Sequence, residues 1–131
     1  LLRVVDHKTG RAPDPRPETV GKGEFLQPAL YAMAAERALG GPVAAAELYY
    51  ATVAQNYEVI SVDLRIARRR ALEVLKAIEG ALRDGFLPAA PRDDACKRCV
   101  YLPVCGPYEE ERVAEKSQAE LGRLKELRAW R

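Results

Sequence analysis

One segment near the start of the chain, Val4-Val5-Asp6-His7-Lys8-Thr9-Gly10, constrains the fold more than any other. Its β-branched residues, and the Thr-Gly pair that follows them, predict a strand over Leu1–Lys8. Because residues two apart on a strand point to the same side, Asp6 and Lys8 project together and His7 points away from them. The chain is therefore expected to hold a strand that carries a carboxylate and an ammonium at its end.

Two further stretches show the spacing of helices. The first is predicted over Gly23–Leu39, with an apolar face at Leu26, Leu30 and Met33. Pro28 requires that this helix starts late or bends there, because proline lacks an N–H and clashes one turn back.

The second helix is predicted over Asp63–Asp84 and is ended by Gly85. Its apolar stripe comprises Leu64, Ala67, Ala71, Leu72, Leu75, Ile78 and Leu82.

Strand patterns fill the space between the two helices. Alternation predicts strands over Ala44–Ala54 and Glu58–Val62, joined as a hairpin by a turn at residues 55–57. Residues 11–20 hold three prolines and no apolar period, which predicts a loop. Together these elements predict an α/β protein with a mixed sheet of at least three strands and helices packed on it.

The last third of the chain differs in composition. A proline-rich connector over Phe86–Asp94 leads into a segment with three cysteines, Cys96, Cys99 and Cys105. Residues 109–131 are charged and helical in composition, with a thin apolar seam at Leu121, Leu124 and Leu127. We expect this end to form a surface or partner helix.

Composition excludes several classes of protein. The chain has 131 residues, 48% of them hydrophobic and 31% charged, which fits one globular domain. No apolar run approaches the roughly 20 residues of a membrane helix, and no signal-peptide pattern is present, so a cytoplasmic location without membrane contact is expected. The net charge is only +2, but four arginines cluster within six residues, at Arg65, Arg68, Arg69 and Arg70.

The pair Asp6 and Lys8 has the composition of a site that hydrolyses phosphodiesters. A carboxylate can hold Mg²⁺, which prefers oxygen ligands, and the metal acidifies a water. The lysine can position that water or stabilise the developing charge. The alternative is an ordinary salt bridge at a strand edge.

A second pair, Gln27 and Tyr31, lies four residues apart on the first predicted helix and shares one face. An amide and a phenol on one face can contact a phosphate or a base. The alternative is a helix that buries its tyrosine and exposes its glutamine.

Together, Asp6-His7-Lys8-Thr9-Gly10, Leu26-Gln27-x₃-Tyr31-Ala32 and Cys96-x₂-Cys99-x₅-Cys105-Gly106 resemble the C-terminal part of a PD-(D/E)XK nuclease of the RecB/AddB type. The CRISPR-associated exonucleases are similar. On this resemblance, residues 1–108 are part of a restriction-endonuclease-like domain and residues 109–131 a charged C-terminal helix.

The resemblance implies an Mg²⁺- or Mn²⁺-dependent DNA exonuclease of end processing, recombination or repair. Asp6 would be a metal ligand, the backbone carbonyl of His7 a second ligand, and Lys8 the catalytic lysine. Gln27 and Tyr31 would face the DNA. A basic helix face beside such a site, at Arg65, Arg68 and Arg69, would contact phosphates.

The resembled nucleases also carry a second aspartate on a preceding strand and an acidic residue or histidine on an upstream helix. We expect that the natural N-terminal part is missing here and that this chain alone does not cleave DNA efficiently.

Three cysteines in a cytosolic protein indicate a metal site rather than disulfides, but zinc sites and [4Fe–4S] clusters both take four ligands. The resemblance places the fourth cysteine upstream and implies that Cys96, Cys99 and Cys105 hold a [4Fe–4S] cluster in the intact protein. Zinc, or three reduced structural thiols, are the alternatives.

Other functions and partners stay open. The chain could be a non-catalytic DNA-binding or scaffold module, or a small zinc-binding interaction domain. As a nuclease it would bind DNA and could act with a helicase subunit or domain. An exposed sheet edge could pair with a second copy.

Overall fold

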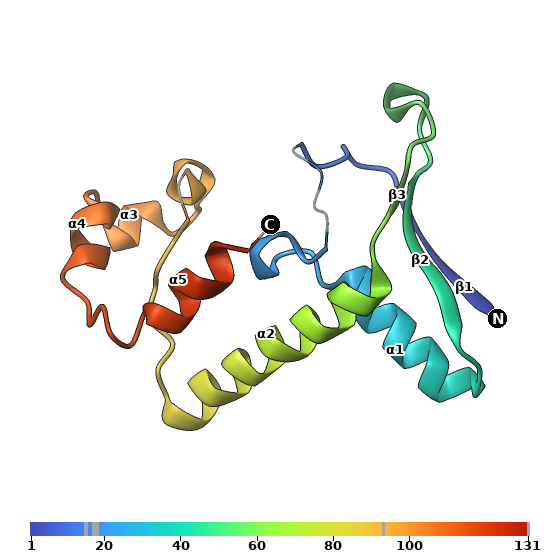
Figure 1. Ribbon diagram of the computed structural model, residues 1–131. Helices are drawn as coiled ribbons and strands as arrows, with labels where there is room; N and C mark the ends of the chain where they lie inside the picture. Colours follow the sequence, from blue (N-terminus) through green and yellow to red (C-terminus); the bar gives the residue numbers. More distant parts are fainter. Residues whose placement is uncertain (15, 17–18, 93, 131) are drawn as a thin grey trace.

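A computed structural model describes residues 1–14, 16, 19–92 and 94–130 of the chain (Figure 1). A three-stranded sheet is formed by β1 (Leu2–Lys8), β2 (Val43–Tyr50) and β3 (Val59–Ser61). The helices are α1 (Gln27–Leu39), α2 (Leu64–Asp84), α3 (Leu102–Cys105), α4 (Glu109–Ala114) and α5 (Gly122–Arg128). Short 3₁₀ turns are η1 (Gly21–Gly23), η2 (Val53–Gln55) and η3 (Ala95–Arg98).

The sheet is mixed, as predicted, with the strand order β1-β2-β3. Strand β1 runs parallel to β2, while β2 and β3 form the expected antiparallel hairpin. Parallel neighbours need a crossover connection, and α1 supplies it. In the register, Asp6 lies beside Leu48 and Lys8 beside Tyr50. The fold is therefore an α/β mixed sheet with flanking helices, consistent with a restriction-endonuclease-like fold.

Helix α1 packs on the face of the sheet that bears the even-numbered residues of β1, and the first half of α2 packs against α1 and completes the same core (Figure 1). The buried part of α1 consists of Pro28, Ala29 and Ala32, and the two alanines pack with Ala46 of β2. The expected face through Leu26, Leu30 and Met33 is only half-buried. Small side chains form this contact because they let the helix backbone approach the sheet closely.

Pro28 required that the first helix either starts late or bends. The helix starts late, at Gln27, and Pro28 occupies its first turn, where the missing N–H costs nothing. This start places Gln27 at the exposed N-terminal end of α1.

Helix α2 has the predicted ends. The Asp63 carboxylate accepts hydrogen bonds from the backbone N–H groups of Arg65 and Ile66, and Gly85 adopts the left-handed conformation with φ 66°. Only the first half of the predicted stripe is buried. Its later residues are 38–61% exposed, namely Leu72, Leu75, Ile78 and Leu82.

Strand β2 ends at Tyr50, four residues before the predicted end. The chain then turns through η2 to Asn56 and Tyr57, which have φ values of 50° and 53°. The predicted turn at residues 55–57 is therefore present. Residues 51–54 leave the strand because the backbone of Tyr57 bonds back to Thr52.

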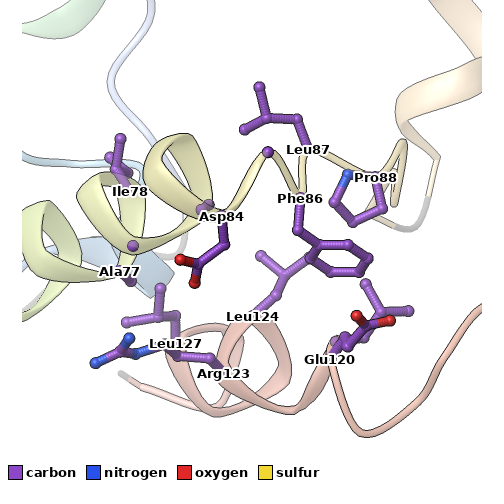
Figure 2. Close-up of a pocket in the computed structure, with 14 residues that line it drawn as sticks. Ala77, Ile78, Asp84, Phe86, Leu87, Pro88, Glu120, Arg123, Leu124 and Leu127 are labelled. Carbon is purple, nitrogen blue, oxygen red and sulfur yellow. The ribbon is translucent and has the colours of Figure 1, made fainter.

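The C-terminal part contains two short helices, α4 and α5, instead of one charged helix. It folds back on α2 and is not simply a surface helix, because Leu121 is 2% exposed and Trp130 stacks 4.2 Å from the Arg70 guanidinium. Between α2, the connector at Phe86 and α5 lies an apolar hollow of about 590 Å³, into which Leu124 points (Figure 2). No helix in the described ranges is both long and apolar enough to cross a membrane.

Candidate active site

The two charged residues of β1 lie together as predicted. The Lys8 Nζ atom is 2.8 Å from Oδ2 of Asp6, and the two side chains are 29% and 20% exposed. Alternation along β1 produces this pairing, since both residues are on the face that the helices cover.

Helix α1 adds an amide and a phenol to this pair. Lys8 Nζ donates a hydrogen bond of 2.7 Å to Oε1 of Gln27, and Nε2 of Gln27 lies 3.5 Å from the Tyr31 hydroxyl. The four side chains of Asp6, Lys8, Gln27 and Tyr31 thus form a continuous polar row from β1 to the first turns of α1. Tyr31 is 44% exposed, so the alternative of a buried tyrosine is wrong.

The His7 side chain points to the opposite face of the sheet. Its ring packs edge-on against Tyr49, with ring centroids 5.4 Å apart. A role for the His7 imidazole beside Asp6 is therefore inconsistent with the geometry.

Tyr50 also lies at this site, although the sequence indicated only that the Tyr49-Tyr50 strand could line the DNA path or pack in the core, and Tyr50 was not among the predicted site residues. It pairs with Lys8 in the β1–β2 register and is 4% exposed. Burial raises the pKa of its phenol, Lys8 lowers it, and Glu58 and Asp6 raise it. The signal in the sequence was its place on β2, two residues after buried Leu48, which puts it on the site's face.

The three arginines predicted to contact DNA have different surroundings. Arg65 and Arg69 are exposed, and Arg65 lies 3.9 Å from Asp63. Arg68 instead donates to Oε1 of Glu36 at 2.7 Å and to the Val43 carbonyl at 3.3 Å. Arg68 thus ties α2 to α1 and β2, which leaves Arg65 and Arg69 as the exposed cations of the predicted set.

One observation bears on whether Asp6 can hold a metal ion. Its Oδ2 atom is buried and accepts no hydrogen bond within the described residues, although the Lys8 ammonium is near. Such an acceptor-only oxygen suits Mg²⁺, which keeps several waters and needs only one or two carboxylates. The described ranges contain no group of three His, Cys, Asp or Glu side chains that could together hold a metal ion.

The cysteines are free thiols in the part of the chain that the structure describes. Cys99 and Cys105 are exposed and Cys96 is half-buried. Desolvation by burial raises the pKa of the Cys96 thiol, with Glu109 and the other two cysteines adding to the rise. The described residues do not gather the three thiols into a ligand set, so the arrangement does not fit a cluster as it stands.

The model of the PD-(D/E)XK nuclease superfamily matches residues 1–106 of the chain. This range contains β1, α1, the hairpin, α2 and all three cysteines. The chain therefore belongs to the PD-(D/E)XK nuclease superfamily. No curated protein and no solved structure matches it significantly.

Proposed function

We propose that the chain is part of a metal-dependent deoxyribonuclease that hydrolyses phosphodiester bonds from DNA ends. The observation that supports this most is the position of Lys8, whose ammonium is held between Asp6 and Gln27. Membership of a nuclease superfamily supports the general class of reaction.

Each side chain has a role in this proposal. Asp6 and the carbonyl of His7 would hold a divalent metal ion, which when bound acidifies water and offsets phosphate charge. Lys8 has three N–H donors; its hydrogen bond to Gln27 takes one and its charge pairs with Asp6, so a donor remains for a phosphate oxygen or the attacking water. Gln27 and Tyr31 extend the polar row along the path of the DNA strand.

Low activity of the isolated chain is part of the proposal. Asp6 is the carboxylate that pairs with Lys8 among the described residues, which is the lower end of the one or two carboxylates of Mg²⁺ sites, so we expect it to hold the ion weakly without further ligands. We expect slow cleavage by this chain alone, and faster cleavage when a further carboxylate is supplied by additional protein.

The test uses linear and closed circular duplex DNA with Mg²⁺, Mn²⁺ or EDTA. Cleavage of the linear DNA alone, lost in EDTA and in Lys8→Met, is expected for an exonuclease. Lys76→Met is the matched control, because Lys76 is exposed on α2. If Lys8→Met retains the metal-dependent cleavage, the proposed site is contradicted. If the isolated chain cleaves DNA rapidly, the expectation that it is only weakly active is contradicted.

The second candidate is a DNA-binding or scaffold module without catalysis. It is favoured because no group of three potential metal-ligating side chains is found among the described residues. It predicts that the chain binds DNA but does not cleave it, with or without Mg²⁺, and that Lys8→Met changes nothing in the cleavage assay.

The setting and partners are also proposals. We place the nuclease in DNA end processing during recombination or repair, of the RecB/AddB type, acting with a helicase subunit or domain. The outer edge of β1 has no strand partner among the described residues, which suits pairing with a second copy. The test is the mass in solution by light scattering. A wild-type dimer that Val5→Pro reduces to a monomer would support this pairing, and a wild-type monomer at high concentration would oppose it.

A [4Fe–4S] cluster on Cys96, Cys99 and Cys105 in the intact protein is proposed from the resemblance and their spacing. Because the thiols are not gathered, binding would have to reorganise residues 96–105 and recruit a fourth ligand. Iron and labile sulfide in anaerobically purified intact protein would support it, and zinc alone would contradict it.

A further inference from the structure

A row of three residues crosses the sheet at the end where Lys8 lies. Tyr50 pairs with Lys8 on one side, and on the other its backbone N–H donates to the Glu58 carbonyl at 2.8 Å. The Glu58 carboxylate forms an ion pair with Arg16. A phenol therefore stands between the ammonium of the proposed site and a carboxylate that is already neutralised.

The hydroxyl of Tyr50 has no evident structural purpose. Its ring packs with Leu48 and Ile60 and against Phe25, a set of contacts that phenylalanine could also make. No other described residue hydrogen-bonds the hydroxyl, yet it is not among the polar atoms sealed from solvent. The hydroxyl of this largely buried residue therefore remains open to a hydrogen-bond partner that comes from outside the described residues.

The charges around Tyr50 determine what that partner can be. A tyrosine phenol, with an ordinary pKa of about 10, is protonated near neutral pH and can act as a donor. The adjacent Lys8 ammonium attracts anions to the same place. A phosphate oxygen satisfies both groups, because it accepts hydrogen bonds and carries negative charge.

We propose that the Tyr50 hydroxyl donates a hydrogen bond to the DNA phosphate group that Lys8 binds. Tyr50 would then be a substrate-contacting residue of the site, on the floor formed by β2. This inference rests on the proposed nuclease function and deepens it.

The first experiment measures the dissociation constant of a short phosphorothioate duplex in Ca²⁺, so that binding is separated from cleavage. Tyr50→Phe should weaken binding about tenfold, as expected for a hydrogen bond to a charged group, without lowering the melting temperature. Tyr49→Phe is the matched control, since Tyr49 lies next in sequence on the opposite face. In the Lys8→Met background, Tyr50→Phe should have a much smaller effect, because both groups bind one phosphate.

The outcomes separate the two proposals. If Lys8→Met weakens binding and Tyr50→Phe does not, the inference about Tyr50 is overturned while the nuclease site stands. If neither variant changes the affinity, the proposed site itself fails.

A second measurement leaves Tyr50 unmodified. Protein labelled with ¹³C at the tyrosine Cζ atoms is titrated with the same duplex and followed by NMR. The Tyr50 resonance should shift in the wild type and much less in Lys8→Met, while Tyr49 stays in place. A duplex-bound protein with an unshifted Tyr50 resonance would overturn the inference even if Tyr50→Phe proved unstable.

Discussion

Replacing Arg68 by methionine should separate a structural arginine from the predicted DNA contacts. Arg68 joins α2 to Glu36 of α1 and to the Val43 carbonyl of β2. A charge-assisted hydrogen bond contributes about 1.5–3 kcal/mol, and we take the lower end because both side chains are about a third exposed and solvent screens the pair. The longer bond to Val43 adds about 0.5 kcal/mol.

One effect of Arg68→Met is stabilising and partly offsets the loss of folding free energy. The Nε atom of Arg68 is buried without a hydrogen-bond partner, and its removal returns about 1 kcal/mol. The net loss for Arg68→Met is therefore about 1 kcal/mol, or a melting temperature lower by roughly 3–5 °C for a domain of this size.

The assay combines thermal unfolding with DNA binding at several salt concentrations. Arg69→Met is the matched control and should change stability by less than about 0.5 kcal/mol, because Arg69 is exposed. If Arg69 contacts a phosphate, its removal lowers the salt slope by about one, whereas Arg68→Met leaves the slope unchanged. An Arg68→Met protein with wild-type stability and a reduced slope would refute this reasoning.

Three further predictions concern stability. Asp63→Ala should cost about 1 kcal/mol in urea unfolding, since it removes the cap of α2, and an unchanged midpoint would count against the cap. Leu48→Ala should cost about 3 kcal/mol, because Leu48 is 1% exposed beneath the site; a loss below about 1 kcal/mol would mean that the cavity collapses. The Tyr50 pKa is raised above its usual 10.0, so the unfolded chain ionises at this residue before the folded protein does. The free energy of unfolding is therefore undiminished below about pH 10 and falls as the pH rises through the folded pKa. Tyr50→Phe should flatten this alkaline decline, and an equally steep decline in the variant would contradict the assignment.

Local patterns predicted the elements that position the site. Strand alternation placed Asp6 and Lys8 on one side, and helical spacing placed Gln27 and Tyr31 on one face. Both rest on geometry within a few residues, which the backbone imposes regardless of the rest of the protein. The ends of α2 followed from Asp63 and Gly85 for the same reason.

Periodicity was less informative about burial. The stripe of α2 was predicted along its whole length, but α1 and the sheet cover only its first half, and Leu82 is 61% exposed. The buried face of α1 uses Ala29 and Ala32 because a close backbone approach selects small residues. A pattern shows which side of an element is apolar, and the neighbours decide how much of that side is covered.

The sequence by itself determined the direction of each side chain relative to its own strand or helix, and the turns and caps that end those elements. It therefore determined the Asp-x-Lys strand, the Gln-Tyr helix face and the α/β class. Tertiary structure alone decided that Gln27 meets Lys8, that Arg68 binds Glu36 while Arg69 stays exposed, and that Leu121 and Trp130 return to α2. These contacts join residues far apart in the chain, and their formation depends on packing rather than on any local pattern.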